Sequence, residues 1–428
     1  MNDIKLKENT TVGEKYYYIK HKSGLDIYVV PKKFTSNYAI FSTKYGSADN
    51  CFKLEGDKDF ISVPPGIAHY LEHKMFESED GTDTFARFAK NGAHVNAFTS
   101  NEMTAYLFDG MDEFDENLES LLDFVSKPYF TPENVEKERG IIGQEIRMCE
   151  DNPMRAIHYN LLDALYETNP VKINTAGTVE SIAEITPELL YSCYRTFYNL
   201  SNMMLVAVGD ITPEQVIKVA DKVLPVQEEK KIIRFYGTEK RTVNKSRVTA
   251  QFDIAAPMIY LGIKTPEIPT DPMKRLKRKM EVSTLFDLMF GSTSEFALDV
   301  YQSGLVRGFD AVYTLDHMYG MGVLRGESPE PEKVWEKFIS YTEEKKKTGF
   351  SREDFDRIKR VQYAGSIKMC DFVHNIAFAF TMLKHDDSDI FDCIEAEKEV
   401  KFEDMLPLAN EIFREEYYAM SVVEPKKK

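Results

Sequence analysis

Apolar and polar positions alternate along the chain with two different periods, which predicts both strands and helices. Short runs rich in β-branched and aromatic residues, most of them bounded by Gly, Pro, Asn or Asp, are typical of strands. Longer segments with helical apolar spacing are typical of amphipathic helices, and several open on Thr-Pro, which suits an N-cap followed by the first helical residue. The predicted strands are residues 25–30, 38–44, 204–208, 255–263 and 319–324, and the predicted helices are residues 65–76, 114–126, 133–148, 188–197 and 213–223.

The order of these elements favours an α+β sandwich over a doubly wound parallel sheet, because strands come in pairs and helices in runs. The two halves of the chain also resemble each other at three places in the same order, which indicates an internal duplication. The matching segments are 131–149 with 351–370, 85–100 with 296–314, and 185–210 with 400–425.

A polar segment, residues 227–246, lies between the two copies and is typical of a linker. We therefore predict an N-terminal peptidase-like domain over residues 1–226 and a C-terminal repeat domain over residues 247–428. A chain of 428 residues is long enough for two such domains, and its 43% hydrophobic content supplies the apolar surface that two cores need.

Charge and cysteine usage restrict the partners and the compartment. The formal net charge of -16 repels phosphate backbones and anionic lipid, so we expect neither nucleic acid nor membrane as a partner. No stretch reaches the roughly 18 apolar residues of a membrane span. Five widely spaced cysteines form no CxxC pair, which indicates free thiols in a reducing compartment. The sequence therefore predicts a cytoplasmic location, with export by a route that the sequence does not show as the alternative.

The segment His69-Tyr70-Leu71-Glu72-His73 is the clearest candidate for chemistry. On a helix, His69 and His73 are one turn apart, so both imidazoles project from one face and can bind one ion. Glu72 shares that face. The order HxxEH is the inverted zincin pattern. The alternative, that these residues merely decorate a surface, is disfavoured because a chance match in such a chain is rare.

A hydrolytic zinc site needs a third protein ligand, and the predicted helix 133–148 offers Glu138 and Glu145, two turns apart on one face. The second copy acts as an internal control, because it carries neither the histidines nor the acids. His69, Glu72 and His73 align with Ser283, Phe286 and Asp287, and Glu138 and Glu145 align with Lys359 and Ser366.

With these motifs, the chain resembles the insulinase/pitrilysin family of inverted zincins, close to its bacterial branch that is similar to mitochondrial processing peptidases. The resemblance implies two duplicated αβ domains that close around a peptide. It also implies a zinc ion held by His69, His73 and Glu145, with Glu138 as a supporting acid. Residues 92–99 resemble the family's substrate-binding edge strand, which makes Asn96, Ala97, Phe98 and Thr99 candidate peptide-binding residues. His94, in the same strand, is a rival metal ligand, although a strand histidine without metal is the simpler interpretation.

One departure from the family pattern concerns an Arg and a Tyr that active members present from their C-terminal half. Here Val300 occupies the position of the Arg. Arg307 and Tyr313 follow shortly after and are candidate substitutes for substrate binding. A partner chain is the other source, since some relatives of this branch are heterodimers in which one subunit binds zinc and the other brings the Arg/Tyr pair. The resemblance therefore implies a homodimer or heterodimer, with this chain as the zinc-bearing subunit.

These observations lead to one hypothesis for function and two alternatives. The hypothesis is zinc-dependent hydrolysis of peptides or leader peptides, in which Glu72 is the general base and the strand at residues 92–99 holds the peptide extended. The first alternative is a structural subunit that has kept the fold and lost catalysis. The second is a peptide-binding module without catalysis.

Overall fold

The computed structural model describes residues 3–10 and 12–426, and these form two compact units. Each unit is assembled from segments that are distant in the sequence. The first unit comprises Met1–Ile146, Ile173–Tyr236 and Ile367–His385, and the second comprises Arg147–Lys172, Gly237–Ser366 and Asp386–Lys428.

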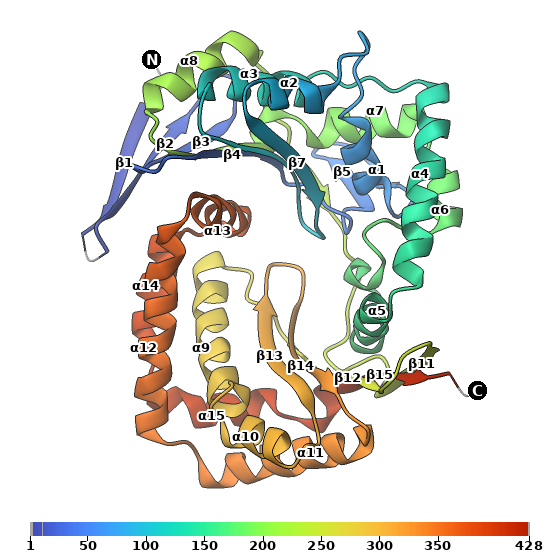
Figure 1. The fold of residues 1–428 in the computed structure, drawn as a ribbon, viewed down its shortest axis with the longest axis vertical. Helices are drawn as coiled ribbons and strands as arrows, with labels where there is room; N and C mark the ends of the chain where they lie inside the picture. The colour runs from blue at the N-terminus through green and yellow to red at the C-terminus, as the bar shows by residue number, and fades with distance from the viewer. Residues whose placement is uncertain (1–2, 11, 427–428) are drawn as a thin grey trace. The chain divides into compact units, whose positions relative to one another are not determined.

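The first unit is built on a seven-stranded sheet with the order β1-β2-β3-β9-β4-β8-β7 (Figure 1). Neighbouring strands are antiparallel except β3 and β9, which run parallel. The central strand β9 is apolar throughout because both of its faces are covered. The strands are β1 Asp3–Asn9, β2 Glu14–Lys20, β3 Asp26–Pro31, β4 Asn37–Thr43, β7 Ala93–Thr99, β8 Thr104–Gly110 and β9 Met203–Gly209.

Helices cover both faces of this sheet, and a small sheet of order β10-β5-β6 completes the unit. Figure 1 shows α2, α3 and α8 on one face and α13 on the other. The helices are α1 Ile67–Lys74, α2 Thr84–Lys90, α3 Phe114–Val125, α4 Pro132–Glu150, α6 Val179–Ala183, α7 Pro187–Phe197, α8 Pro213–Val223 and α13 Val373–His385; the small strands are β5 Cys51–Leu54, β6 Ile61–Ser62 and β10 Ile232–Arg234.

Helix α13 comes from the second half of the sequence but belongs to the core of the first unit. Phe380 is 2% exposed and packs edge-on against Tyr16 at 4.8 Å between ring centroids. At the end of the helix, His385 Nε2 lies 2.9 Å from the hydroxyl oxygen of Ser42 on β4. The helix therefore supplies both apolar and polar contacts to the sheet.

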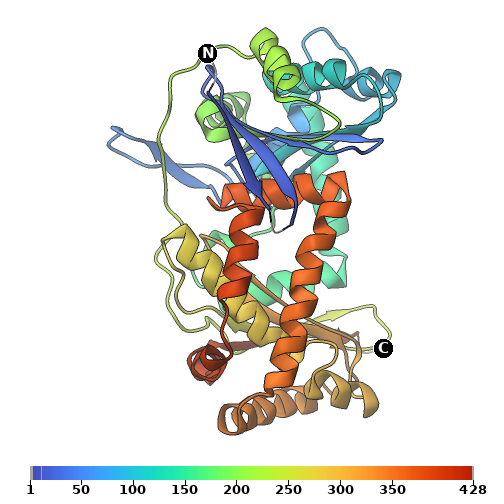
Figure 2. The ribbon, with the colours of Figure 1, turned by 90° about the vertical axis from the view of Figure 1, so that its left-hand side faces the viewer.

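The second unit is built on a five-stranded sheet with the order β11-β15-β12-β14-β13. Helix α5 packs against β11, β12 and β15, while α9 packs against β13 and α14 lies beside α9 (Figure 2). The strands are β11 Arg247–Phe252, β12 Met258–Lys264, β13 Arg307–Leu315, β14 Gly320–Glu327 and β15 Tyr418–Pro425; the helices are α5 Pro153–Leu165, α9 Pro272–Phe290, α10 Glu295–Gln302, α11 Pro331–Thr348, α12 Arg352–Lys368, α14 Ile390–Glu399 and α15 Met405–Ile412.

The two sheets share one topology. In chain order, β3, β4, β7, β8 and β9 form the arrangement 3-9-4-8-7, and β11 to β15 form the matching arrangement 11-15-12-14-13. In both sheets the first neighbouring pair is parallel and the other three are antiparallel. The predicted α+β class with two homologous domains is therefore confirmed.

The compact units differ from a linear division of the chain. The predicted boundaries, 1–226, 227–246 and 247–428, stay a prediction, and they do not include the reciprocal exchange of residues 147–172 and 367–385. The predicted linker also contains β10, which pairs with β5. Among the residues that the structure describes, no helix combines the length and the apolar character that crossing a bilayer requires.

Candidate metal centre

The helix α1 presents the two histidines of the HxxEH segment on one side and apolar residues on the other. Gly66 precedes the helix with φ of 90°, a conformation that glycine adopts without strain. Ile67, Tyr70 and Leu71 are fully buried and fix the rotation of the helix about its axis. The side chains of His69 and His73 are 13% and 26% exposed, so a ligand from solvent can reach them.

The helix α4 brings Glu145 to both imidazoles. Its carboxylate oxygens lie 3.8 Å from His69 Nε2 and 3.7 Å from His73 Nε2. The three ligand atoms lie within 4.8 Å of one another. The helical spacing of His69 and His73 and the position of Glu145 on the neighbouring helix thus create one cluster.

The second acid of α4, Glu138, binds the other nitrogen of His73. Its Oε1 lies 2.9 Å from His73 Nδ1. Burial is the largest single effect and raises the pKa of Glu138, but the hydrogen bond to His73 and the positive charges of His73, Lys74 and Lys137 together exceed it, so the net pKa is lowered. An ionised carboxylate only accepts hydrogen bonds, so Nδ1 carries the proton and Nε2 keeps its lone pair for a metal.

The pKa of His73 is raised by the same arrangement. Burial lowers it, but the hydrogen bond to Glu138 and the nearby carboxylates of Glu72 and Glu145 together exceed the effect of burial. The carboxylates of Glu72, Glu138 and Glu145 around His73 therefore stabilise positive charge at this site.

These residues fit a zinc ion. Two histidines and one carboxylate form a ligand set of catalytic zinc sites, which leave a fourth position for water. Zinc–ligand distances of about 2.0–2.2 Å place tetrahedral ligand atoms roughly 3.3–3.5 Å apart, close to the separations of 3.7 and 3.8 Å seen here. A small approach of side chains is enough to coordinate the ion.

Glu72 lies on α1 between the two histidines and is only 7% exposed. Its Oε2 accepts a hydrogen bond of 2.7 Å from the hydroxyl of Thr99 on β7. Burial raises the pKa of Glu72, and the Thr99 hydrogen bond and the charge of His73 only partly oppose this. A buried carboxylate with a raised pKa beside candidate metal ligands is suited to accept and return a proton.

The strand β7, which carries the predicted peptide-binding residues, is an edge strand of the first unit (Figure 1). The amide of Ser100 bonds to the carbonyl of Met103, so in this antiparallel hairpin the odd-numbered residues of β7 direct their N–H and C=O groups to the open edge. The outward N–H of Ala97 is bound by the side chain of Asn96 at 2.9 Å. An extended peptide can take this place.

Two further residues of β7 have distinct surroundings. Phe98 points to the face that α13 covers and stacks on Phe378 at 5.3 Å between ring centroids. His94 is exposed, and among the described residues it joins no group of potential metal ligands. Its role as a rival ligand therefore has no geometric support.

The candidate substitutes for the family's Arg and Tyr lie on β13 of the second unit. Arg307 is exposed at the start of the strand. Tyr313 is 9% exposed, and its hydroxyl lies 3.0 Å from that of Thr265. Burial raises the pKa of Tyr313 to about 12. Val300, at the position of the family's Arg, is fully buried in the apolar core of this unit.

Two positions of the second unit that match Glu72 and His73 carry an apolar core residue and a hydrogen-bonded carboxylate instead. Phe286, opposite Glu72, is 3% exposed within the apolar core. Asp287, opposite His73, accepts a hydrogen bond of 2.8 Å from the side-chain amide of Gln362. The second unit thus offers no copy of this histidine and glutamate cluster among its described residues.

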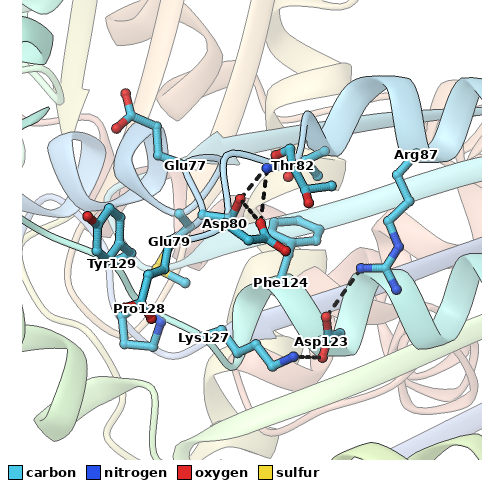
Figure 3. Close-up of a pocket in the computed structure, with 13 residues that line it drawn as sticks. Glu77, Glu79, Asp80, Thr82, Arg87, Asp123, Phe124, Lys127, Pro128 and Tyr129 are labelled. Carbon is cyan, nitrogen blue, oxygen red and sulfur yellow. Dashed lines mark hydrogen bonds and ion pairs between the residues drawn. The ribbon is translucent and has the colours of Figure 1, made fainter.

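A pocket of about 620 Å³ lies beside the end of α1, between the segment that follows this helix and the end of α3 (Figure 3). Asp123 forms ion pairs there with Arg87 and Lys127, and Asp80 accepts hydrogen bonds from Ser78 and Thr82. Its lining includes none of the candidate metal ligands. We assign it no part in the metal centre.

Two features of the site were not predicted from the sequence. The hydrogen bond from Thr99 to Glu72 joins residues assigned separately to peptide binding and catalysis. The sequence match of 85–100 with 296–314 gives no signal for it, because the residue that corresponds to Thr99, Leu315, lies beyond that match and is identified only by the hairpin register. The contact of Phe378 with Phe98 left no signal, because nothing in the sequence of α13 shows which sheet it covers.

The chain matches two family models and known proteins over most of its length. The family model described as Insulinase (Peptidase family M16) matches residues 63–179, and the model described as Peptidase M16 inactive domain matches residues 184–362. Over 428 residues the chain is 36% identical to the zinc protease YmfH of Bacillus subtilis, itself described as uncharacterised, with 99% of this chain and 100% of that protein covered.

Solved structures show the same fold. A protein from Alicyclobacillus acidocaldarius described as an M16-like peptidase is 32% identical, with a TM-score of 0.91 and 99% of each chain covered. Pitrilysin is 15% identical with a TM-score of 0.75, and the match covers 100% of this chain but 47% of the pitrilysin chain. The sequence and structure matches together show that this chain belongs to the insulinase/pitrilysin family of peptidases.

Proposed function

We propose that this chain is a zinc-dependent metallopeptidase that hydrolyses extended peptides. The observation that carries the proposal is the cluster of His69, His73 and Glu145, whose ligand atoms lie within 4.8 Å of one another beside the buried carboxylate of Glu72. Names of relatives that contain the words zinc protease support the same metal and reaction.

In this proposal, one group of residues binds the metal and another residue transfers the proton. His69, His73 and Glu145 hold the zinc ion, and Glu138 fixes His73 in the tautomer that directs Nε2 to the metal. When bound, zinc acidifies a water molecule and polarises the carbonyl group of the substrate. Glu72 would accept a proton from the attacking water and return it to the leaving amine.

The open edge of β7 holds the substrate. A peptide that adds to this edge forms main-chain hydrogen bonds with Ala97 and its odd-numbered neighbours. Such binding requires an extended peptide backbone and depends little on the peptide's sequence. The side chain of Asn96 must release the Ala97 amide first. Ala97 and Thr99 are therefore the proposed main-chain partners of the peptide, whereas Asn96 and Phe98, which also belong to the predicted peptide-binding segment, direct their main chain to β8.

A second subunit completes the enzyme in this proposal. The chain spans about half of the pitrilysin chain that it matches, at 47%. Of its own two candidates for the Arg/Tyr pair, Arg307 is exposed, but Tyr313 is buried with its hydroxyl beside that of Thr265. We propose a dimer in which the partner, a second copy or a sister chain, provides this pair. The five cysteines are free thiols, which agrees with the proposed cytoplasmic location.

The alternative is a non-catalytic subunit that binds peptides or serves as a scaffold. The loss of the Arg at Val300 favours it, whereas the intact zinc ligands and the buried Glu72 favour catalysis. A scaffold has no need for one zinc ion per chain, so metal content separates the two.

The test uses the full chain purified without a His tag, alone and mixed with any sister chain encoded beside it, against a library of unstructured peptides. Cleavage should depend on added zinc. Glu72→Gln should keep the metal and lose about 10²–10⁴-fold in rate, and His73→Ala should lose both metal and activity. Cleavage by Glu72→Gln at the wild-type rate would exclude Glu72 as the base.

A further inference from the structure

We infer that Thr99 is a positioning residue for Glu72 and that it couples the docking of a peptide to the orientation of the base. Its hydroxyl holds Oε2 of Glu72, while its main chain faces the edge where the peptide adds. The inference rests on the proposed function and extends it to a residue whose side chain does not touch the substrate.

The contact itself is short and buried. The hydroxyl oxygen of Thr99 lies 2.7 Å from Oε2 of Glu72, whose residue is 7% exposed. A hydrogen bond to an ionised carboxylate is among the stronger ones, and a threonine hydroxyl has a single proton to donate. With Oε2 held in this way, Oε1 is the oxygen that exchanges a proton with the reacting water and the leaving amine, and Thr99 keeps its own proton throughout.

The residue across the hairpin fixes the place of Thr99. Thr104 pairs directly with Thr99, is fully buried, and donates its hydroxyl proton to the carbonyl of Tyr45 at 2.9 Å. The two threonine hydroxyl oxygens are 3.4 Å apart. Because Thr104 donates its proton to Tyr45, it can only accept from Thr99, and the Glu72 carboxylate at 2.7 Å is the nearer and stronger acceptor for the Thr99 proton.

The main chain of Thr99 belongs to the peptide-binding edge. Thr99 and Thr104 form a non-hydrogen-bonded pair, because the next pair, Ser100 with Met103, is bonded at 2.8 Å. The N–H and C=O of Thr99 therefore point away from β8. A peptide strand that pairs with this edge restrains the residue that holds the base.

The second copy provides an independent control. Its hairpin of β13 and β14 has the same register around a four-residue loop, with Leu315 opposite Gly320 where Thr99 is opposite Thr104. Leu315 thus takes the place of Thr99, and Phe286 takes the place of Glu72. Both are at most 3% exposed and share one apolar core. The hydroxyl is absent in the copy that lacks the carboxylate, as a paired role requires.

The first experiment is a kinetic comparison of Thr99→Val and Thr99→Ser with wild type, under conditions where wild type cleaves a peptide. Thr99→Val is nearly isosteric and should lower kcat about 10- to 100-fold, with KM within about 2-fold and zinc content unchanged. Thr99→Ser restores the hydroxyl and should return most of the rate. Thr249→Val, an exposed threonine on the edge strand β11, is the matched control and should behave as wild type.

Unchanged kcat in Thr99→Val, or a change in KM alone, would overturn the inference. The absence of cleavage by wild type would instead count against the proposed function.

The second experiment needs no activity and is performed on metal-free protein in EDTA. Thr99→Val should lower the urea midpoint of the wild type but have little effect in a Glu72→Ala background, because the hydrogen bond is already gone. An equal shift in both backgrounds would show that the hydroxyl does not act through Glu72, whatever the chain catalyses.

Discussion

Two glutamates of the site, Glu72 and Glu138, show how one side-chain type obtains two roles from its surroundings. Burial raises the pKa of Glu72, which prepares it to exchange a proton. At Glu138, the hydrogen bond to His73 and the nearby positive charges together exceed the effect of burial and lower the pKa, which keeps this carboxylate ionised beside the imidazole. Pairs of acids with opposite shifts are typical of sites that separate acid–base work from electrostatic support.

The raised pKa of Glu72 predicts a pH-dependent stability difference in the metal-free protein. Because the folded-state pKa lies above the unfolded value, the stability associated with the protonated group is present at low pH and is lost as the pH rises. Glu72→Gln removes the buried charge and can still accept from Thr99. Its urea midpoint in EDTA should therefore equal that of wild type near pH 4 and exceed it at pH 8. A variant less stable than wild type at pH 8 would contradict this account.

The hydrogen bond between Glu138 and His73 predicts a loss of metal affinity without loss of the ligands. Glu138→Gln should weaken zinc binding about 10- to 100-fold, because the imidazole loses the carboxylate that sets its tautomer. Competition with a chromogenic chelator measures this. Glu136→Gln is the control on the same helix: its side chain is 69% exposed and pairs with Arg139, so the zinc affinity should stay that of wild type.

At the scale of elements, the edge strand β7 predicts that proline is tolerated at one position and not at the next. Ala97 directs its N–H outward, so Ala97→Pro should keep the fold and raise KM about 5-fold through the loss of one main-chain hydrogen bond. Phe98 directs its N–H to β8, so Phe98→Pro should instead lower the melting temperature. Equal effects of the two variants on KM would argue against peptide addition at this edge.

The elements that carry the site were largely predictable from local patterns. The predicted helices 65–76 and 133–148 correspond to α1 Ile67–Lys74 and α4 Pro132–Glu150, because helical spacing is a local signal in both and α4 also has a Thr-Pro start. The predicted strand 255–263 begins three residues late, at Met258. The position of α13 was not predictable, since an apolar helical face does not identify the sheet it will cover.

At the scale of the whole molecule, the two units share one topology but differ in the residues at the position of the candidate metal centre. The first unit keeps buried polar groups around His69, Glu72 and His73, which cost stability and form the proposed metal centre. The second unit replaces Glu72 by Phe286 in its core. The three repeated segments made the duplication visible in the sequence. The exchange of residues 147–172 and 367–385 between the units could not be predicted from the sequence, because it depends on packing between distant segments.

The central claim is that the three predicted ligands hold one zinc ion, and anomalous diffraction at the zinc absorption edge tests it most directly. Crystals of the tag-free full chain grown with zinc chloride should show one peak per chain, about 2.0–2.2 Å from His69 Nε2, His73 Nε2 and a carboxylate oxygen of Glu145. Crystals of Glu145→Gln should show a much weaker peak. No peak at these residues in the wild type, or full occupancy with the Glu145 carboxylate turned away from the ion, would contradict the account.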